Sequence, residues 1–441
     1  MTDTTLEWGL KRLGLKQEYK REFNVQASFG LSFVIMSPIV GLSSGFTYGW
    51  EVGGPGPASW GWAVASIMTL CTGLSLAEIL SGMPVSGGPF FWTALLGGRH
   101  SALLSWITGW CNLFGLTALA AASALATLWN VAAAVQILSG VTLSAWQQLL
   151  ILQGVIVIGG AVNSSSPTRL TRCMFYGAFL NVVGVIFLVL LLPTVGPWRQ
   201  SPKFVFGTFL DKSLSPFVVP SNAYLWIQGV GIALFTLAGF DSCSHLSEEM
   251  KGANSSAPRA MIWSIIASSS IGGVLLLAVL FCIQSPDNLM YSSATSGYAL
   301  GQMLFDVFNA RFGTGIGAVS ALSVCILAGI MTTIACITST SRMMLTISRN
   351  TFEPGPIHLG RWSNTIGWIS IAWIILTMCL LAFPSSLPVT LDEVQFPLIF
   401  GLGGSLAAWF LPKWGARHFY IDPKQQAALA TSPLLDHGRS G

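Results

Sequence analysis

Four side chains that can carry charge or transfer protons occur within one stretch of nine residues. They are Asp241, His245, Glu248 and Glu249 in the segment GFDSCSHLSEE, in a chain of 441 residues with only 17 acidic residues and 5 histidines. The preceding run, LWIQGVGIALFTLA, carries no charge. Because Lys251 follows the two glutamates, the pattern favours a solvated loop face for them over an acid–base pair.

Two interpretations of Asp241 are open. Residues 222–240 alone approach the roughly 20 residues that cross a bilayer, which would place Asp241 in water at the cytoplasmic interface. Alternatively, Gly229, Gly231 and Gly239 loosen the helix, which unwinds over residues 237–241 and leaves residues 242–250 as a second half-helix. A carboxylate at that depth would be a functional residue, because charge in a membrane is costly.

The element that must position these residues is a membrane span. Only 9% of the residues are charged and 52% are hydrophobic, whereas a soluble domain carries about 25% charged residues. Lipid cannot satisfy free backbone groups, so the spans must be helical. We expect about ten of them, at residues 23–50, 58–77, 102–128, 147–163, 173–196, 222–240, 260–284, 314–341, 365–383 and 396–412.

The distribution of positive charge predicts how these spans are oriented. With the N-terminus in the cytoplasm, only Arg199, Lys203, Lys212 and Arg311 of the 21 lysines and arginines fall outside. Cytoplasmic loops are enriched in these residues, so both termini are expected in the cytoplasm. The chain then divides into a cytoplasmic tail (1–22), a transmembrane domain (23–412) and a second cytoplasmic tail (413–441).

The first span contains a second candidate interruption, in SFVIMSPIVGLSSGFTYG. Gly41, Gly45 and Gly49 are spaced four apart, which is typical of a face for close helix packing. Pro38 beside serines and glycines also favours a broken helix whose freed backbone groups line a binding cavity. The two interpretations are compatible, because one face can pack while the other opens.

The sequence does not contain the usual signatures of catalysis. The five histidines are scattered without a ligand pair, and the chain has no phosphate-binding loop of the Walker type. We therefore expect a protein that is not an enzyme, with no cofactor, metal, ATP or nucleic-acid partner. Its partners would be the lipid bilayer and a small molecule.

Several blocks resemble the amino acid–polyamine–organocation superfamily, notably GLSLAEILSGMPVSGGPFFW, SWITGWCNLFG and GFDSCSHLSEEMKGANSSAPRAM. The chain is most similar to the branch that contains fungal choline and GABA permeases and plant bidirectional amino-acid transporters. The resemblance implies an all-α polytopic membrane protein with the LeuT-like bundle of two inverted repeats. It also implies a plasma-membrane or vacuolar transporter of amino acids or related amines, with coupling to an H⁺ or Na⁺ gradient possible.

The resemblance implies a substrate site between two broken helices. Partial charges at half-helix ends suit a zwitterion or a cation there. The first break would span residues 37–44 and the second residues 237–241. The residues carried over to the site are Ser37, Gly41, Ser43, Ser44, Gly239, Phe240 and Asp241.

The chain departs from these relatives after Asn350. Relatives have twelve spans, with two of them between the SR…SRD segment and a segment like FEPGPIHLGRW, whereas here Asn350 runs directly into Thr351 and Phe352. The equivalents of spans 9 and 10 are therefore expected to be missing. A non-transporting, truncated family member is the alternative function.

Overall fold

The computed structural model describes residues 25–209, 226, 229–289, 295 and 297–347. Within these residues the long elements are helices, and seven helical segments are long and apolar enough to cross a membrane. The spans predicted at 365–383 and 396–412, and the junction at Asn350, lie outside the described residues. The predicted span at 222–240 is described only in part.

The spans follow the predicted order with shifted ends. The first consists of α2 (Val25–Ile35) and α3 (Pro38–Val52). The others are α4 (Pro55–Gly82), α6 (Ser101–Ser139), α7 (Ala145–Asn163), α8 (Pro167–Val195), α12 (Ala253–Phe281) and α14 (Ala318–Ile347). Residues 222–240 supply only a short described helix, α11 (Val230–Thr236), followed by the 3₁₀ helix η2 (Phe240–Glu249).

The largest differences from prediction lie where a helix continues past its most apolar stretch. Helix α6 continues to Ser139, beyond the predicted end at residue 128, and ends at Gly140 in the left-handed conformation. Helix α8 begins at Pro167, so its first turns contain Arg169 and Arg172, which a search for uncharged windows excludes. Proline at a first helical position is favourable because its missing N–H would have no partner there.

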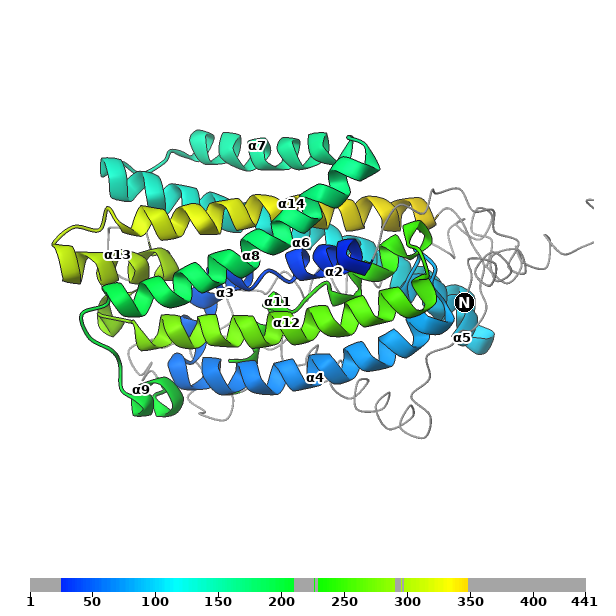
Figure 1. Cartoon of the computed structure of the whole chain (residues 1–441), viewed down its shortest axis with the longest axis horizontal. Coiled ribbons are helices and arrows are strands. Elements are labelled where there is room, and N and C mark those ends of the chain that lie inside the picture. Colours follow the sequence, from blue (N-terminus) through cyan, green and yellow to red (C-terminus); the bar gives the residue numbers. More distant parts are fainter. Residues whose placement is uncertain (1–24, 210–225, 227–228, 290–294, 296, 348–441) are drawn as a thin grey trace, which may run out of the picture.

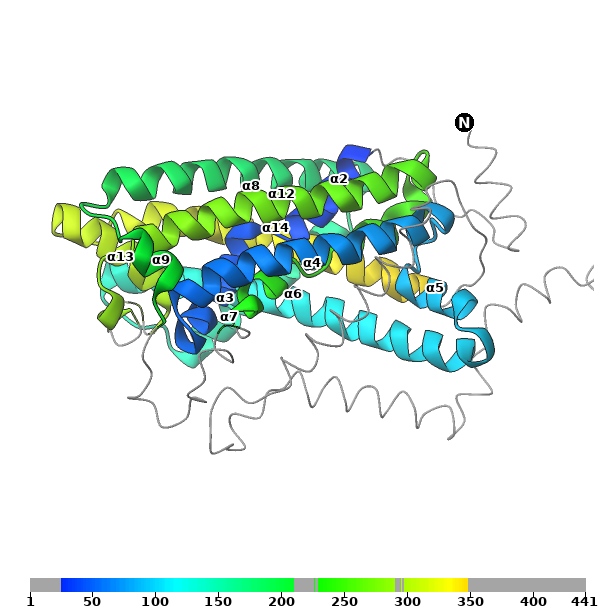
Figure 2. The same ribbon diagram turned by 90° about the horizontal axis from the view of Figure 1, so that it is seen from below.

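The two halves of the first span lie at the centre of the bundle (Figure 1). In the most apolar stretch of residues 25–51, 83% of the residues are buried, against 11% in α7. Helix α14 packs mainly on α6, and α12 packs mainly on α4. Figure 2 shows α8 and α6 on opposite sides of the bundle, with α7 at its periphery in Figure 1. The broken helix is thereby shielded from lipid by unbroken ones.

Short helices cover the two ends of the bundle. One end holds α5 (Pro89–Leu96) and the turn η1 (Gly98–His100). The opposite end holds α9 (Pro202–Gly207) and α13 (Ala299–Phe312), as Figure 1 shows. The turn η3 (Pro286–Asn288) lies between α12 and α13 in the chain.

The glycines of the first span do form a packing face. A methyl carbon added at Gly41 would lie 2.5 Å from Cβ of Thr236, and the nearest atoms around Gly45 and Gly49 belong to Ile232. Both partners are residues of α11, so small residues let α3 and α11 approach closely. The first span is therefore both interrupted and closely packed, whereas a binding cavity lined by its break stays a prediction.

Candidate functional site

The first interruption is shorter than predicted. Helix α2 ends at Ile35 and α3 begins at Pro38, so the break comprises Met36 and Ser37. The prediction that it extends over residues 37–44 is wrong, because Pro38 suits a first helical position and the following residues continue as helix. Ser37 caps α3, its Oγ accepting a hydrogen bond from the backbone N–H of Val40 at 3.3 Å.

A second contact of Ser37 ties the break to another helix. Its hydroxyl donates to Oδ1 of Asn181 on α8, and Nδ2 of Asn181 donates to the carbonyl of Gly177 at 3.0 Å. Ser37 and Asn181 are both buried. The hydroxyls of Ser43 and Ser44 instead donate to carbonyls one turn back in α3, each at 2.7 Å. Of the serines predicted for the site, Ser37 lies at the break itself.

The second interruption lies between α11 and η2, at Leu237–Gly239. Gly239 has φ +83°, a conformation in which L residues are strained, and it starts η2. A methyl carbon at Gly239 would lie 2.5 Å from Cγ2 of Ile35, the last residue of α2. The two interruptions are therefore neighbours in the bundle.

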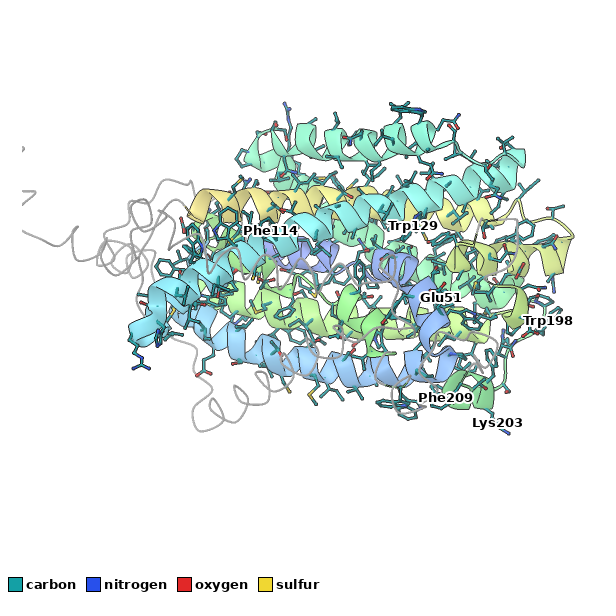
Figure 3. The ribbon with its side chains drawn as sticks, turned by 180° about the vertical axis from the view of Figure 1, so that it is seen from behind. Glu51, Phe114, Trp129, Trp198, Lys203 and Phe209 are labelled. Carbon is teal, nitrogen blue, oxygen red and sulfur yellow. The ribbon has the colours of Figure 1, made fainter. Side chains whose placement is uncertain are left out.

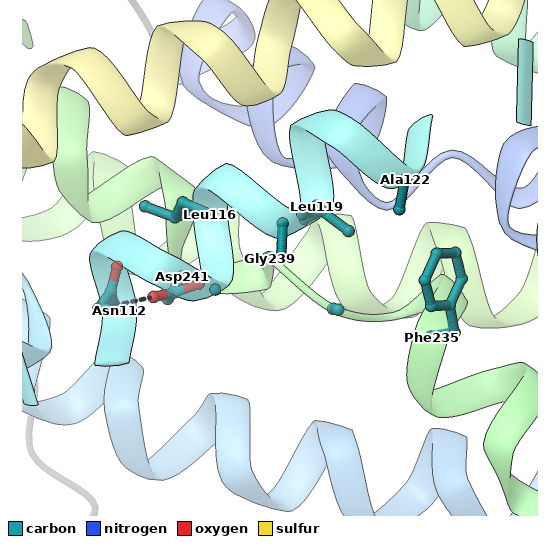
Figure 4. A pocket seen from close by; sticks show the side chains of 10 residues that line it. Asn112, Leu116, Leu119, Ala122, Phe235, Gly239 and Asp241 are labelled. Carbon is teal, nitrogen blue, oxygen red and sulfur yellow. Dashed lines mark hydrogen bonds between the residues drawn. The ribbon is translucent and has the colours of Figure 1, made fainter. Parts of the chain in front are cut away.

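A cavity of about 400 Å³ lies beside the second interruption. Figure 4 shows its wall of α6 side chains on one side and Phe235, Gly239 and Asp241 on the other. Nδ2 of Asn112 on α6 donates to Oδ2 of Asp241 at 3.2 Å. The remaining lining residues have no side-chain polar group; they are Gly115, Leu116, Ala118, Leu119, Ala122 and Ala238.

Asp241 does not lie in open water. Its side chain is 17% exposed, it contributes to the cavity wall, and it follows a helix break. The broken-helix interpretation of Asp241 describes the structure, with a 3₁₀ second half that begins at Phe240. The depth of Asp241 in the membrane stays a prediction. Among the residues predicted for the site, Gly239 and Asp241 line this cavity, whereas Ser37, Gly41, Ser43, Ser44 and Phe240 are not among its lining residues.

The sequence interpretation missed Asn112. The signal was present, because Asn112 is the amide in the apolar run SWITGWCNLFG. Polar side chains within membrane spans commonly hydrogen-bond to another helix, which is what Asn112 does. The other α6 residues of the wall are glycine, alanine and leucine, which carry no such signal.

The far end of η2 is held by polar contacts. Nδ1 of His245 lies 3.0 Å from the carbonyl oxygen of Ser86, and the N–H of Ser86 donates to Oε1 of Glu248 at 3.0 Å. Oε1 of Glu249 pairs with Nε of Arg342 on α14 at 3.0 Å, with Glu249 5% and Arg342 16% exposed. The expectation of a solvated loop face is therefore wrong for Glu249, because α14 brings a cation against it.

The comparisons with known proteins agree with this architecture. The sequence model described as "Amino acid permease" matches residues 27–355. The amino-acid permease BAT1 of Arabidopsis thaliana is 28% identical over an alignment that covers 94% of this chain and 95% of the plant protein. The BAT1 homolog of Oryza sativa is 28% identical, over 94% of each chain. The GABA-specific permease of Saccharomyces cerevisiae is 24% identical, over 94% of this chain and 85% of the yeast protein.

The alignment with the Arabidopsis protein runs over 500 positions, which is more than the 441 residues of this chain. Part of the alignment therefore consists of positions at which this chain has a gap. The family match extends through both helix breaks and through the cavity wall formed by α6. The chain forms a helical membrane bundle with two adjacent breaks, and one family of transporters matches most of its length. It is therefore an integral membrane protein that belongs to the amino acid permease family.

Proposed function

We propose that this protein is a secondary active transporter that moves amino acids or related amines, such as GABA or choline, across a membrane by alternating access. The observation that carries the proposal is the carboxylate of Asp241, which is 17% exposed in the wall of a mostly apolar cavity at a helix break. The cavity volume of about 400 Å³ falls within the 300–1,000 Å³ typical of small-molecule sites. A carboxylate in such a wall recognises an ammonium group.

Asn112 supports this role for Asp241. Its amide donates to Oδ2 at 3.2 Å, which fixes the orientation of the carboxylate and leaves Oδ1 for a ligand. Asn112 is neutral, so it orients Asp241 without cancelling the negative charge. In this proposal the amine of the substrate binds beside Gly239, Phe240 and Asp241.

The carboxylate of an amino acid would be recognised at the first break. The N-terminus of α3 carries partial positive charge from the aligned peptide dipoles of the helix. Ser37 and Gly41 lie in the break and the first turn of that helix, and Ser43 and Ser44 follow within the second. Because Gly239 lies against Ile35, a small zwitterion could contact both breaks at once.

The sidedness of the bundle supports cytoplasmic termini. The end that holds α5 also holds the start of α12 and the end of α14 (Figure 1). These segments contain or adjoin Arg99, Arg259 and Arg342, which the charge distribution assigns to the cytoplasm. Figure 3 labels Trp198 and Lys203 at the opposite end of the molecule, the side expected to face outward. The membrane would be the plasma membrane or the membrane of a vacuole.

A second function has an observation in its favour. Gaps in this chain within the alignment to the Arabidopsis permease are consistent with the loss of spans 9 and 10 after Asn350. Without these helices the chain would be a regulatory or inactive family member. Sequencing the transcript across Asn350 and Thr351 shows whether an in-frame segment of two spans is encoded there.

Transport is tested with purified protein in liposomes. Counterflow of labelled amino acids, GABA and choline should occur with the wild type. Asp241→Asn should weaken the apparent affinity for the amine about 10- to 100-fold, because a hydrogen bond to a charged group contributes about 1.5–3 kcal/mol. Asp287→Asn, at an exposed position in η3, is the matched control and should behave as wild type. Counterflow of none of these compounds by correctly folded protein would refute the transporter and favour the second function.

A further inference from the structure

His245 lies in a setting that the transport proposal has not used. It is fully buried and sits one turn after Asp241 in η2, with Nε2 3.9 Å from Oδ2 of Asp241. Its other ring nitrogen, Nδ1, contacts the carbonyl oxygen of Ser86, which can only accept a hydrogen bond. The hydrogen of a neutral His245 is therefore on Nδ1, and Nε2 carries a lone pair.

Nε2 of His245 has no hydrogen-bond partner among the described residues. Buried polar atoms without a partner are uncommon, because losing hydration without a replacement bond costs free energy. A proton on Nε2 would convert this lone pair into an N–H whose nitrogen lies 3.9 Å from a carboxylate oxygen of Asp241. It would also make the N–H bond to Ser86 charge-assisted and stronger.

The elements packed on η2 supply few competing charges. Helix α2 and the described loop at residues 83–88 contain no titratable side chain. The charged and titratable groups of α4, α6, α12 and α14 are Cys71, Glu78, Cys111, Arg259, Cys325, Cys336 and Arg342. Within η2, Glu248 accepts from Ser86 and Glu249 pairs with Arg342, and Cys243 is the remaining titratable residue. Among the described residues, the carboxylate near Nε2 of His245 is therefore that of Asp241.

We propose that Asp241 and His245 form a proton-binding pair, and that a proton on Nε2 of His245 and the amine of a substrate compete for the carboxylate of Asp241. The proposal rests on the transport function proposed above. A proton enters through the cavity, past Oδ2 of Asp241, and binds the lone pair of Nε2. When an ammonium group binds Asp241, its positive charge repels the imidazolium, and the proton leaves Nε2 for water by the same route. One carboxylate then neutralises one cation at a time.

Competition for one group makes transport an exchange. Each half-cycle carries either the proton or the amine, so acid on one side of the membrane should drive amine toward that side. A gradient of one pH unit can at most support about a tenfold accumulation in a one-for-one exchange, since tenfold corresponds to about 1.4 kcal/mol. Histidine is suited to this role because its charge changes between about pH 5 and 8.

The experiment uses the full chain in liposomes, with the potential clamped at zero by potassium and valinomycin. Labelled GABA, choline or whichever amine shows counterflow is added outside, with the interior one pH unit more acidic, and protein-free liposomes correct for passive entry. Wild type should accumulate the amine up to about tenfold, and reversing the gradient should deplete it. Counterflow at equal pH on the two sides measures transport without the gradient.

His245→Asn removes the titratable group while its amide can still donate to the carbonyl of Ser86. In this variant the gradient-driven accumulation per unit of counterflow should fall to about zero, once passive entry into protein-free liposomes has been subtracted. His100→Asn, at an exposed histidine in η1, is the control and should keep the wild-type ratio. The exchange would be refuted if counterflow occurs but the pH gradient has no effect, or if acid outside drives accumulation. The transport function would remain supported in both cases. The wild-type measurement alone decides whether transport is such an exchange, even if His245→Asn does not fold. Absence of counterflow would refute transport and the exchange together.

Discussion

Replacing Gly239 by alanine perturbs two features of the second break at once. The first is the backbone, because φ at Gly239 is +83° and an L residue in the left-handed region costs about 1–2 kcal/mol. The second is space, because the new methyl carbon would lie 2.5 Å from Cγ2 of Ile35 and 3.2 Å from Cδ2 of Leu119. Overpacking of this kind costs about 1–3 kcal/mol. Together the two effects should lower the free energy of unfolding by about 2–5 kcal/mol.

Gly140 separates the two costs. It also has a positive φ, +71°, but no atom lies within 4 Å of the position where its methyl carbon would be. Gly140→Ala should therefore show the backbone cost alone, about 1–2 kcal/mol. Both variants are measured by reversible unfolding in mixed detergent micelles, where the difference between them reports the crowding at the break.

A third variant tests which neighbour matters. Gly239→Ala combined with Ile35→Ala should recover part of the loss relative to the sum of the single changes, because the contacting Cγ2 is gone. Residues in contact typically show interaction energies of about 0.5–3 kcal/mol. If Gly239→Ala costs no more than Gly140→Ala, the close approach of the two breaks inferred here is refuted. Gly239→Leu, which would fill the break, should abolish counterflow.

Two further predictions concern the contacts that fix the broken helices. Arg342→Ala should lower the free energy of unfolding by about 3–5 kcal/mol, because Glu249 would remain buried without a partner; a loss below about 1 kcal/mol, the value for exposed pairs, would contradict burial of this pair. Ser37→Ala should cost about 1–3 kcal/mol, since it removes the cap of α3 and leaves Oδ1 of Asn181 unpaired. Ser44→Ala should be close to neutral, because its hydroxyl bonds to carbonyls of its own helix and alanine favours helix; equal losses for the two serines would contradict the assignment of the break to Ser37.

The location of both breaks was predictable from sequence, but their extent was not. Gly239 marked the second break because glycine readily adopts the left-handed conformation found there. Pro38 marked the first, yet the same residue also starts a helix efficiently, and α3 begins at it. A proline therefore identifies an interruption without telling on which side it lies. The residues after Pro38 continue as α3 and pack closely on α11, and this tertiary packing is not encoded in a local pattern.

The polar contacts around η2 were hidden for a different reason. Glu249 and Arg342 lie 93 positions apart, and each by itself resembles a solvated residue at a helix end. Asn112 and Asp241 are similarly separated, by 129 positions. Only the arrangement of α6, η2 and α14 reveals that one short 3₁₀ segment carries the cavity carboxylate, the buried histidine and the glutamate paired with α14.

This arrangement has a mechanical consequence. Asp241 is two residues from the hinge at Gly239, whereas Glu248 and Glu249 hold the other end of the same segment to Ser86 and Arg342. A ligand that moves Asp241 must therefore either bend η2 or strain the contacts at its far end. The 3₁₀ helix has poorer hydrogen-bond geometry than an α-helix, and a stretch of it within a helical span often marks a hinge or strain. If the proposed amine binds at Asp241, we expect its binding to be coupled to these contacts through the ten residues of η2, so Arg342→Ala should change the apparent affinity for the amine although Arg342 is not a cavity residue.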